Sequence, residues 1–177
     1  MKKWFFIFVV FAALVFFFLF TGPGLDILIK LPDSNRKAGW APFAYYYIGR
    51  LHSITGRHDE GTEVYRLVQE CYWKELKDEK FVESDVWRHY VPKALFYEGV
   101  GCEEMGDAEL LSAEKYRAQG DESSYETHVA DAKEYYINAL ECYNSFIAYF
   151  TDDVLYSSAN QRHSKLLMKL GMLHSPR

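Results

Sequence analysis

The chain has 177 residues, of which 49 % are apolar, 25 % charged and 18 % aromatic. This length suffices for one domain with its own core, and the aromatic content, with five Pro and eleven Gly, excludes collagen-like and disordered chains. The chain after residue 20 contains 18 basic and 25 acidic side chains and is therefore acidic overall. We therefore expect neither nucleic acid nor an anionic lipid surface as a partner.

Residues 4–20 read WFFIFVVFAALVFFFLF, an apolar run that Gly22-Pro23-Gly24 follows. As a helix this run would span roughly 26 Å, close to the hydrocarbon thickness of a bilayer. The sequence therefore predicts that residues 1–24 form a transmembrane signal-anchor, which contacts lipid through residues 4–20. Two alternatives are a cleaved signal peptide and a helix buried among other membrane subunits.

Charge around this segment predicts its orientation. Lys2 and Lys3 precede it and the acidic remainder follows it. The positive-inside rule then places the N-terminus in the cytoplasm. The remaining chain is expected in the periplasm or another extracytoplasmic space, with a mitochondrial inner-membrane protein as the alternative. Residues 25–40 are expected to be a linker or interfacial segment. The short apolar patch over 25–31 lies either at the membrane interface or against the domain, and the polar stretch PDSNRKAG follows it as a linker.

From residue 41 onward the apolar residues recur with a helical period, and no convincing strand alternation is visible. The pattern predicts an all-α protein. The expected helices are 41–55, 59–76, 84–105, 108–119, 124–150 and 153–170.

Small residues recur in pairs seven positions apart within this helical region. The pairs are Gly49 with Gly56, Gly99 with Gly106, and Ser164 with Gly171. The first member of each pair is expected in mid-helix, where it lets an antiparallel helix come close. The second is expected at the helix end, where glycine adopts the positive φ that terminates a helix.

This pattern resembles the tetratricopeptide repeat family, in the divergent form found in bacterial envelope proteins. The residues that carry the resemblance are Tyr45, Ile48, Gly49, Gly56, Gly61 and Tyr65, then Leu95, Gly99, Gly106, Ala139 and Tyr143, and finally Ser164 and Gly171. The segment ALECYNSFIAYF is similar to the envelope pattern A-x-x-x-Y-x-x-F-I-x-x-Y-P, with Phe150 where Pro is usual. Glu98 and His163 depart from the family by replacing a large apolar residue.

The resemblance implies that residues 41–177 form a short solenoid of antiparallel helical hairpins. An insertion at about residues 107–131 is expected to extend the second hairpin as two helical arms. An unrelated helical bundle is the alternative, because small residues at intervals of seven also occur in ordinary bundles.

The sequence predicts no enzyme, no cofactor and no metal site, since no catalytic or nucleotide-binding motif that we sought is present. His128, Asp131 and Glu134 share a helix edge at intervals of three, which favours a solvated face over a metal site. Cys102 and Cys142 lie on the two helices of the proposed second hairpin and could form a disulfide. Three small buried side chains, including Cys71, are the alternative.

The resemblance further implies protein or peptide binding on a concave surface lined by the first helix of each hairpin. The positions expected to be exposed there are Phe43, Tyr46, Arg50, Ser53, Phe96, Val100, Glu103, Gln161 and Lys165. We therefore expect a membrane-anchored scaffold that holds a protein partner in or at a membrane. The alternatives are that these side chains pack internally, and that the chain is a structural accessory subunit held mainly by its transmembrane helix.

Overall fold

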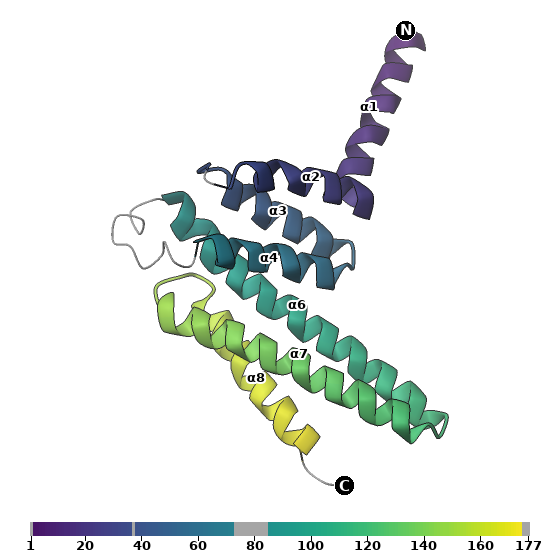
Figure 1. The fold of residues 1–177 in the computed structure, drawn as a ribbon, viewed down its shortest axis with the longest axis vertical. Helices are drawn as coiled ribbons and strands as arrows, with labels where there is room; N and C mark the ends of the chain where they lie inside the picture. Colours follow the sequence, from purple (N-terminus) through teal and green to yellow (C-terminus); the bar gives the residue numbers. More distant parts are fainter. Residues whose placement is uncertain (1, 37, 73–84, 175–177) are drawn as a thin grey trace.

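The computed structural model describes residues 2–36, 38–72 and 85–174, and these residues are helical with no strand among them. The prediction of an all-α fold is confirmed. The helices labelled in Figure 1 are α1 (Lys2–Phe20), α2 (Gly22–Ser34), α3 (Ala41–Ile54), α4 (His58–Tyr72), α6 (Asp85–Ala118), α7 (Glu122–Tyr149) and α8 (Tyr156–His174).

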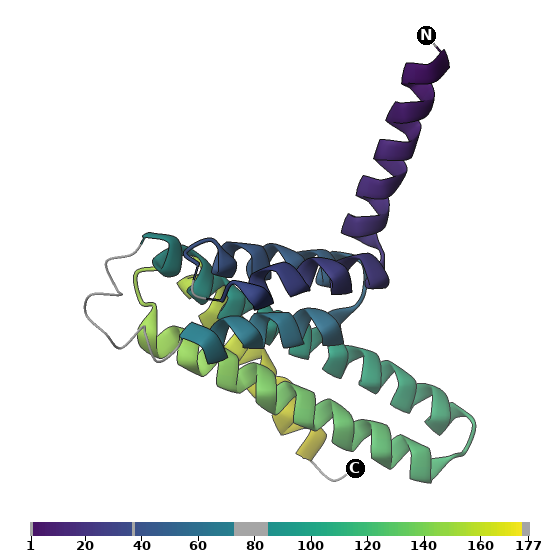
Figure 2. The same ribbon diagram turned by 45° about the horizontal axis from the view of Figure 1, so that its top comes forward.

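Helices α2 to α8 stack in chain order, each packed against the next one in the sequence. In addition α3 contacts α6, so that the first helices of two successive hairpins lie side by side. The apolar helix α1 leaves this stack and projects away from it in both views (Figures 1 and 2). Within the described residues no individual helix has the length and apolar character to cross a membrane. The segments Val9–Phe17 and Gly22–Ser34, which are bent by 75° relative to each other, meet these two criteria only when they are counted together.

Residues 25–34, which were expected to be a linker or an interfacial segment, belong to helix α2 (Gly22–Ser34), so an unstructured linker over these residues is wrong. Thr21 caps this helix, its Oγ1 accepting a hydrogen bond of 3.2 Å from the Gly24 amide. Leu25 is fully buried, and the Tyr45 hydroxyl of α3 donates a 2.7 Å hydrogen bond to Asp33. The apolar patch thus packs as a helix face against the domain.

A second correction concerns Gly106, which was expected to end a helix. It lies inside the 34-residue helix α6, which replaces the two helices expected over 84–105 and 108–119. A Cβ atom at Gly106 would lie 2.6 Å from the Tyr136 ring of α7. Gly106 therefore serves close packing rather than termination. The chain reverses at Gly120 instead, whose φ is +78°, so that α6 and α7 carry residues 107–131 as two helical arms.

The same glycine–tyrosine contact occurs in both hairpins. A Cβ atom at Gly49 in α3 would lie 2.6 Å from the Tyr65 ring of α4, and one at Gly99 in α6 would lie 2.8 Å from the Tyr143 ring of α7. Both tyrosines are fully buried. The mid-helix glycines therefore let the second helix of each hairpin approach closely, as the sequence predicts.

The expected helix-ending glycines behave differently from one another. Gly56 has a φ of +79° and follows Thr55, the C-terminal cap of α3, which confirms that prediction. Gly171 lies inside α8, which continues to His174, and a Cβ atom added there would meet nothing within 4 Å. The prediction that Gly171 ends its helix is therefore wrong.

Two apolar clusters hold the stack together. The first joins α2, α3, α4 and the start of α6, and its largest members are Tyr45 and Tyr65. The second joins α6, α7 and α8 around Tyr136, Tyr143 and Phe146. Because Tyr97 and Phe150 pack against both clusters, the two hairpins share one continuous core.

His52 of α3 is a buried titratable residue in this core. It is 2 % exposed and its Nδ1 has no hydrogen-bond partner. Burial lowers the pKa of His52 below its ordinary 6.5, and Arg57 lowers it further, while Asp26 on α2 and Asp59 on α4 oppose them. The folded protein therefore holds this imidazole neutral near pH 7.

We expect the protein to lose stability as the pH falls through about 6.5, because the unfolded chain then binds a proton that the folded chain excludes from His52. The full contribution is present above pH 6.5 and falls, by at most about 1.4 kcal/mol per pH unit, until the lowered folded pKa is reached. Urea unfolding at a series of pH values measures the slope. His52→Gln should flatten it, and an unchanged slope would show that His52 is not its source.

Candidate protein-binding surface

Five aromatic side chains from α3 and α6 form a continuous cluster, which we call the aromatic surface. Its members are Phe43, Tyr46, Tyr47, Tyr90 and Tyr97. The Phe43 ring centre lies 4.6 Å from that of Tyr47 and 5.4 Å from that of Tyr90, in an edge-on arrangement with the latter. Tyr46 lies 5.6 Å from Tyr90 and 6.1 Å from Tyr97. These separations are typical of favourable aromatic pairs.

Two cations lie over this cluster. The Arg50 guanidinium is 4.0 Å from the centre of the Tyr97 ring, and the Lys93 ammonium is 5.7 Å from that of Tyr90. Burial, and secondarily the neighbouring Tyr97, raises the pKa of Tyr46. The phenol therefore stays neutral at physiological pH and can donate a hydrogen bond.

The rim of the aromatic surface is open to solvent. Phe43 is 46 % and Tyr47 is 47 % exposed, and Trp40, which directly precedes α3, is 44 % exposed. Tyr46, Tyr90 and Tyr97 are half-buried beneath them. The surface thus has a packed base, which fixes the ring positions, and exposed rings that can enter a contact.

The binding residues predicted from the sequence differ in how exposed they are in the structure. On α3, Phe43 is exposed, whereas Tyr46, Arg50 and Ser53 are half-buried, as is Val100 on α6. Gln161 and Lys165 are exposed on α8.

The expected exposure of Phe96 and Glu103 is wrong, since both are buried. The Phe96 ring lies 5.9 Å from each of Tyr143 and Phe146 in the second core. Glu103 accepts hydrogen bonds from Arg162 of α8 at 2.7 Å and from the Tyr143 hydroxyl at 3.2 Å. Glu103 therefore links three helices, and its charge is compensated inside the protein.

Sequence reasoning missed Tyr47, Tyr90 and Tyr97. Tyr47 follows Phe43 by four residues, and Tyr97 follows Tyr90 by seven, so each pair shares a helix face. This spacing could have identified the aromatic face of each helix. It could not have shown that α3 packs against α6, because that contact joins residues that are distant in the sequence.

Cys102 and Cys142, named above as a possible disulfide, are free, buried thiols in the structure, as the alternative of small buried side chains has it. Burial raises the pKa of the Cys102 thiol to about 12 and that of Cys142 further still. Both therefore remain protonated and behave as small apolar side chains. The Cys71 side chain lies outside the described residues.

One group of potential metal ligands occurs near the tip of the α6–α7 hairpin, within the described part of the chain. Its ligand atoms belong to Glu109, His128 and Asp131 and lie within 4.8 Å of one another. His128 Nδ1 is 2.6 Å from Glu109 Oε2, and the His128 ring stacks on Tyr116 at 5.0 Å. These contacts satisfy the imidazole within the hairpin. Glu134, predicted with this edge, is not part of the group.

Comparisons with known proteins returned no matching family model, no matching curated protein and no matching solved structure.

Proposed function

We propose that this protein is a membrane-anchored scaffold that binds a protein partner through its aromatic surface. The observation that carries this proposal is the pair of exposed rings of Phe43 and Tyr47 on a packed aromatic base with Arg50 beside it. Aromatic and arginine side chains are enriched among the residues that dominate binding energy at protein interfaces. Rings that are already fixed by their neighbours lose little entropy when a partner covers them.

We also propose that α3, α4, α6 and α7 are repeated hairpins of the tetratricopeptide type, and two contacts support this. The glycine–tyrosine contact recurs in the α3–α4 and α6–α7 hairpins, and α3 lies beside α6. Stacked hairpins of this kind present their first helices on one face, which repeat proteins use for binding. The aromatic surface lies on those two first helices.

The proposed anchor is α1. Its described side chains are exposed and apolar, with Phe11 64 % and Phe16 61 % exposed, and the helix projects from the stack (Figure 2). Such a surface is favourable in lipid and unfavourable in water. We propose a cytoplasmic N-terminus and a helical domain on the opposite side of the membrane.

The uncovered α1 also favours a second candidate function. The chain could be a structural accessory subunit whose α1 packs among the helices of a larger membrane complex. In that case the sequence of α1, rather than the aromatic surface, selects the partner.

The double variant Phe43→Ser with Tyr47→Ser should reduce partner capture at least tenfold, since exposed aromatic anchors typically contribute about 1 to 2 kcal/mol each to binding. The measurement is chemical crosslinking in native membranes, followed by quantitative mass spectrometry of co-purified proteins. Neither ring belongs to the buried core, so the variant should keep the helical content and unfolding midpoint of the wild type.

The matched control is Leu111→Ser with Ile137→Ser, which removes two exposed apolar side chains, 62 % and 48 % exposed, from the α6–α7 hairpin. This control should capture partners as the wild type does. Equal losses in both variants would show that general surface hydrophobicity, and not the aromatic surface, mediates capture.

A further inference from the structure

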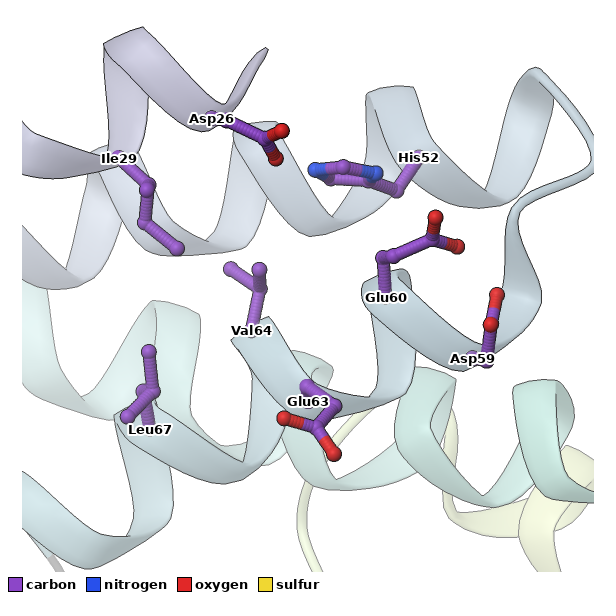
Figure 3. Close-up of a pocket in the computed structure, with 8 residues that line it drawn as sticks. All are labelled: Asp26, Ile29, His52, Asp59, Glu60, Glu63, Val64 and Leu67. Atoms are coloured by element: carbon purple, nitrogen blue, oxygen red, sulfur yellow. The ribbon is translucent and has the colours of Figure 1, made fainter. Parts of the chain in front are cut away.

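A pocket of about 300 Å³ lies between α2, α3 and α4. Figure 3 shows the residues that line it: Asp26, Ile29, His52, Asp59, Glu60, Glu63, Val64 and Leu67. This volume is at the lower end of the range for small-ligand sites. The pocket is separate from the aromatic surface, because α2 and α4 build most of it and α6 contributes no lining residue.

The pocket is strongly acidic. Four of its eight lining residues carry a carboxylate, one on α2 and three on α4. Arg57, in the turn before α4, acts on His52 and Glu60 but does not line the pocket. The helix dipole at the start of α4 accounts for Asp59 and Glu60. It does not account for Asp26, which comes from a different helix, or for Glu63, beyond the first turn.

Two of these carboxyl groups, those of Asp59 and Glu60, belong to adjacent residues and influence one another. Their side-chain interaction lowers the pKa of Asp59 and raises the pKa of Glu60. Two neighbouring carboxylates repel each other, and either a proton or a bound cation reduces this repulsion. The pair is therefore a natural position for a positively charged group.

His52 gives an independent indication of a ligand. It is 2 % exposed, lines the pocket, and its Nδ1 is buried without a hydrogen-bond partner. In Figure 3 the imidazole lies between the carboxylates of Asp26 and Glu60. Since its pKa is lowered by burial, it is neutral and adds no positive charge that would repel a cation.

The remaining wall is apolar. Ile29 of α2 faces Val64 and Leu67 of α4 across the pocket (Figure 3). An apolar wall offers no ligand atoms to a metal ion. Among the described residues, the close grouping of three potential metal ligands is at Glu109, His128 and Asp131, outside this pocket. A ligand with an aliphatic stem and a charged head matches both parts of the lining.

We propose that this pocket binds a primary alkylammonium group, with the ammonium among the carboxylates and the aliphatic stem against Ile29, Val64 and Leu67. Such a group occurs in free aliphatic diamines and in the lysine side chain of a peptide. The ammonium donates three hydrogen bonds to acidic oxygens, and the stem displaces water from the apolar wall.

Calorimetric titration of the full chain in uncharged detergent tests this proposal. The probes are 1,5-diaminopentane as the free amine, a lysine-containing peptide with its termini blocked, and two controls without the charge: 1,5-pentanediol and the same peptide acetylated on the lysine. We expect at least one amine probe to bind and both uncharged controls to show no binding at millimolar concentration. Tighter binding of the free diamine identifies a small-molecule site, and tighter binding of the peptide identifies a lysine side chain as the ligand.

The variant Glu60→Gln with Glu63→Gln removes two of the four charges and should weaken amine binding about tenfold or more. Its matched control, Glu126→Gln with Glu134→Gln, removes two exposed charges from α7 and should bind as the wild type does. Asp26→Asn on α2 gives a second test should the α4 variant unfold. Binding that is equal in wild type and both pocket variants, or absent for both amines, would overturn the proposal. Loss of partner capture by the Phe43 and Tyr47 variant has no bearing on this result.

Discussion

Gly99→Ala should lower the free energy of unfolding by about 1 to 3 kcal/mol, the usual cost of forcing an extra group into a packed core. Alanine favours a helix by about 1 kcal/mol over glycine, but here its Cβ would lie 2.8 Å from the Tyr143 ring. That ring cannot withdraw, because it is fully buried and its hydroxyl is bound to Glu103. Denaturant unfolding of the purified protein measures the difference.

The control for this substitution is Gly171→Ala in α8, where a Cβ would meet nothing within 4 Å. Helix propensity alone then operates, and the variant should be as stable as the wild type or more stable by up to about 1 kcal/mol. Gly49→Ala, opposite Tyr65, should behave like Gly99→Ala. If Gly99→Ala matched Gly171→Ala, the close approach of α6 and α7 would be disproved.

Deleting residues 2–20 should move the protein from the membrane to the soluble fraction with its helical domain intact. The reason is that α1 carries exposed Phe, Val and Leu side chains, whereas the cores lie in α2 to α8. Fractionation of cells in alkaline carbonate, followed by circular dichroism of the released protein, provides the measurement. A truncated protein that stays in the membrane pellet after carbonate would contradict the assignment of α1 as the anchor.

Replacing residues 4–20 by an unrelated membrane-spanning sequence separates the two candidate functions. A scaffold that acts through its aromatic surface should keep its partners, because any anchor positions the domain. An accessory subunit recognised through α1 should lose them. Protease protection of the helical domain in intact vesicles, compared between the two proteins, controls for an altered orientation.

The local features of the fold were predictable from the sequence, because they depend on single residues and short spacings. Gly49 and Gly99 were identified as close-contact positions, and Gly56 as the end of a helix. Gly106 was misjudged, since glycine both ends helices and admits close neighbours, and its role depends on Tyr136 thirty residues away. The helix α2 was missed because a polar stretch with Pro32 follows its apolar patch, although a packed face at Leu25 is enough to order it.

The candidate surface was predictable only in part. Phe43 was correctly placed at an exposed position, since the first helix of a hairpin leaves one face uncovered. Phe96 and Glu103 were misplaced because α8 and α7 cover that part of α6 through Arg162 and Phe146. Such coverage depends on the tertiary packing of distant helices, and the helical period of α6 carries no information about it.

Site-specific photocrosslinking in native membranes tests the central claim most directly. A photoreactive phenylalanine at position 47, on the aromatic surface, is compared with one at position 137, on α7, two positions that are almost equally exposed. The account predicts a discrete, stoichiometric protein adduct from position 47 and background labelling from position 137. Equal labelling at both positions, or an adduct from position 137 alone, would contradict the claim that the aromatic surface binds the partner.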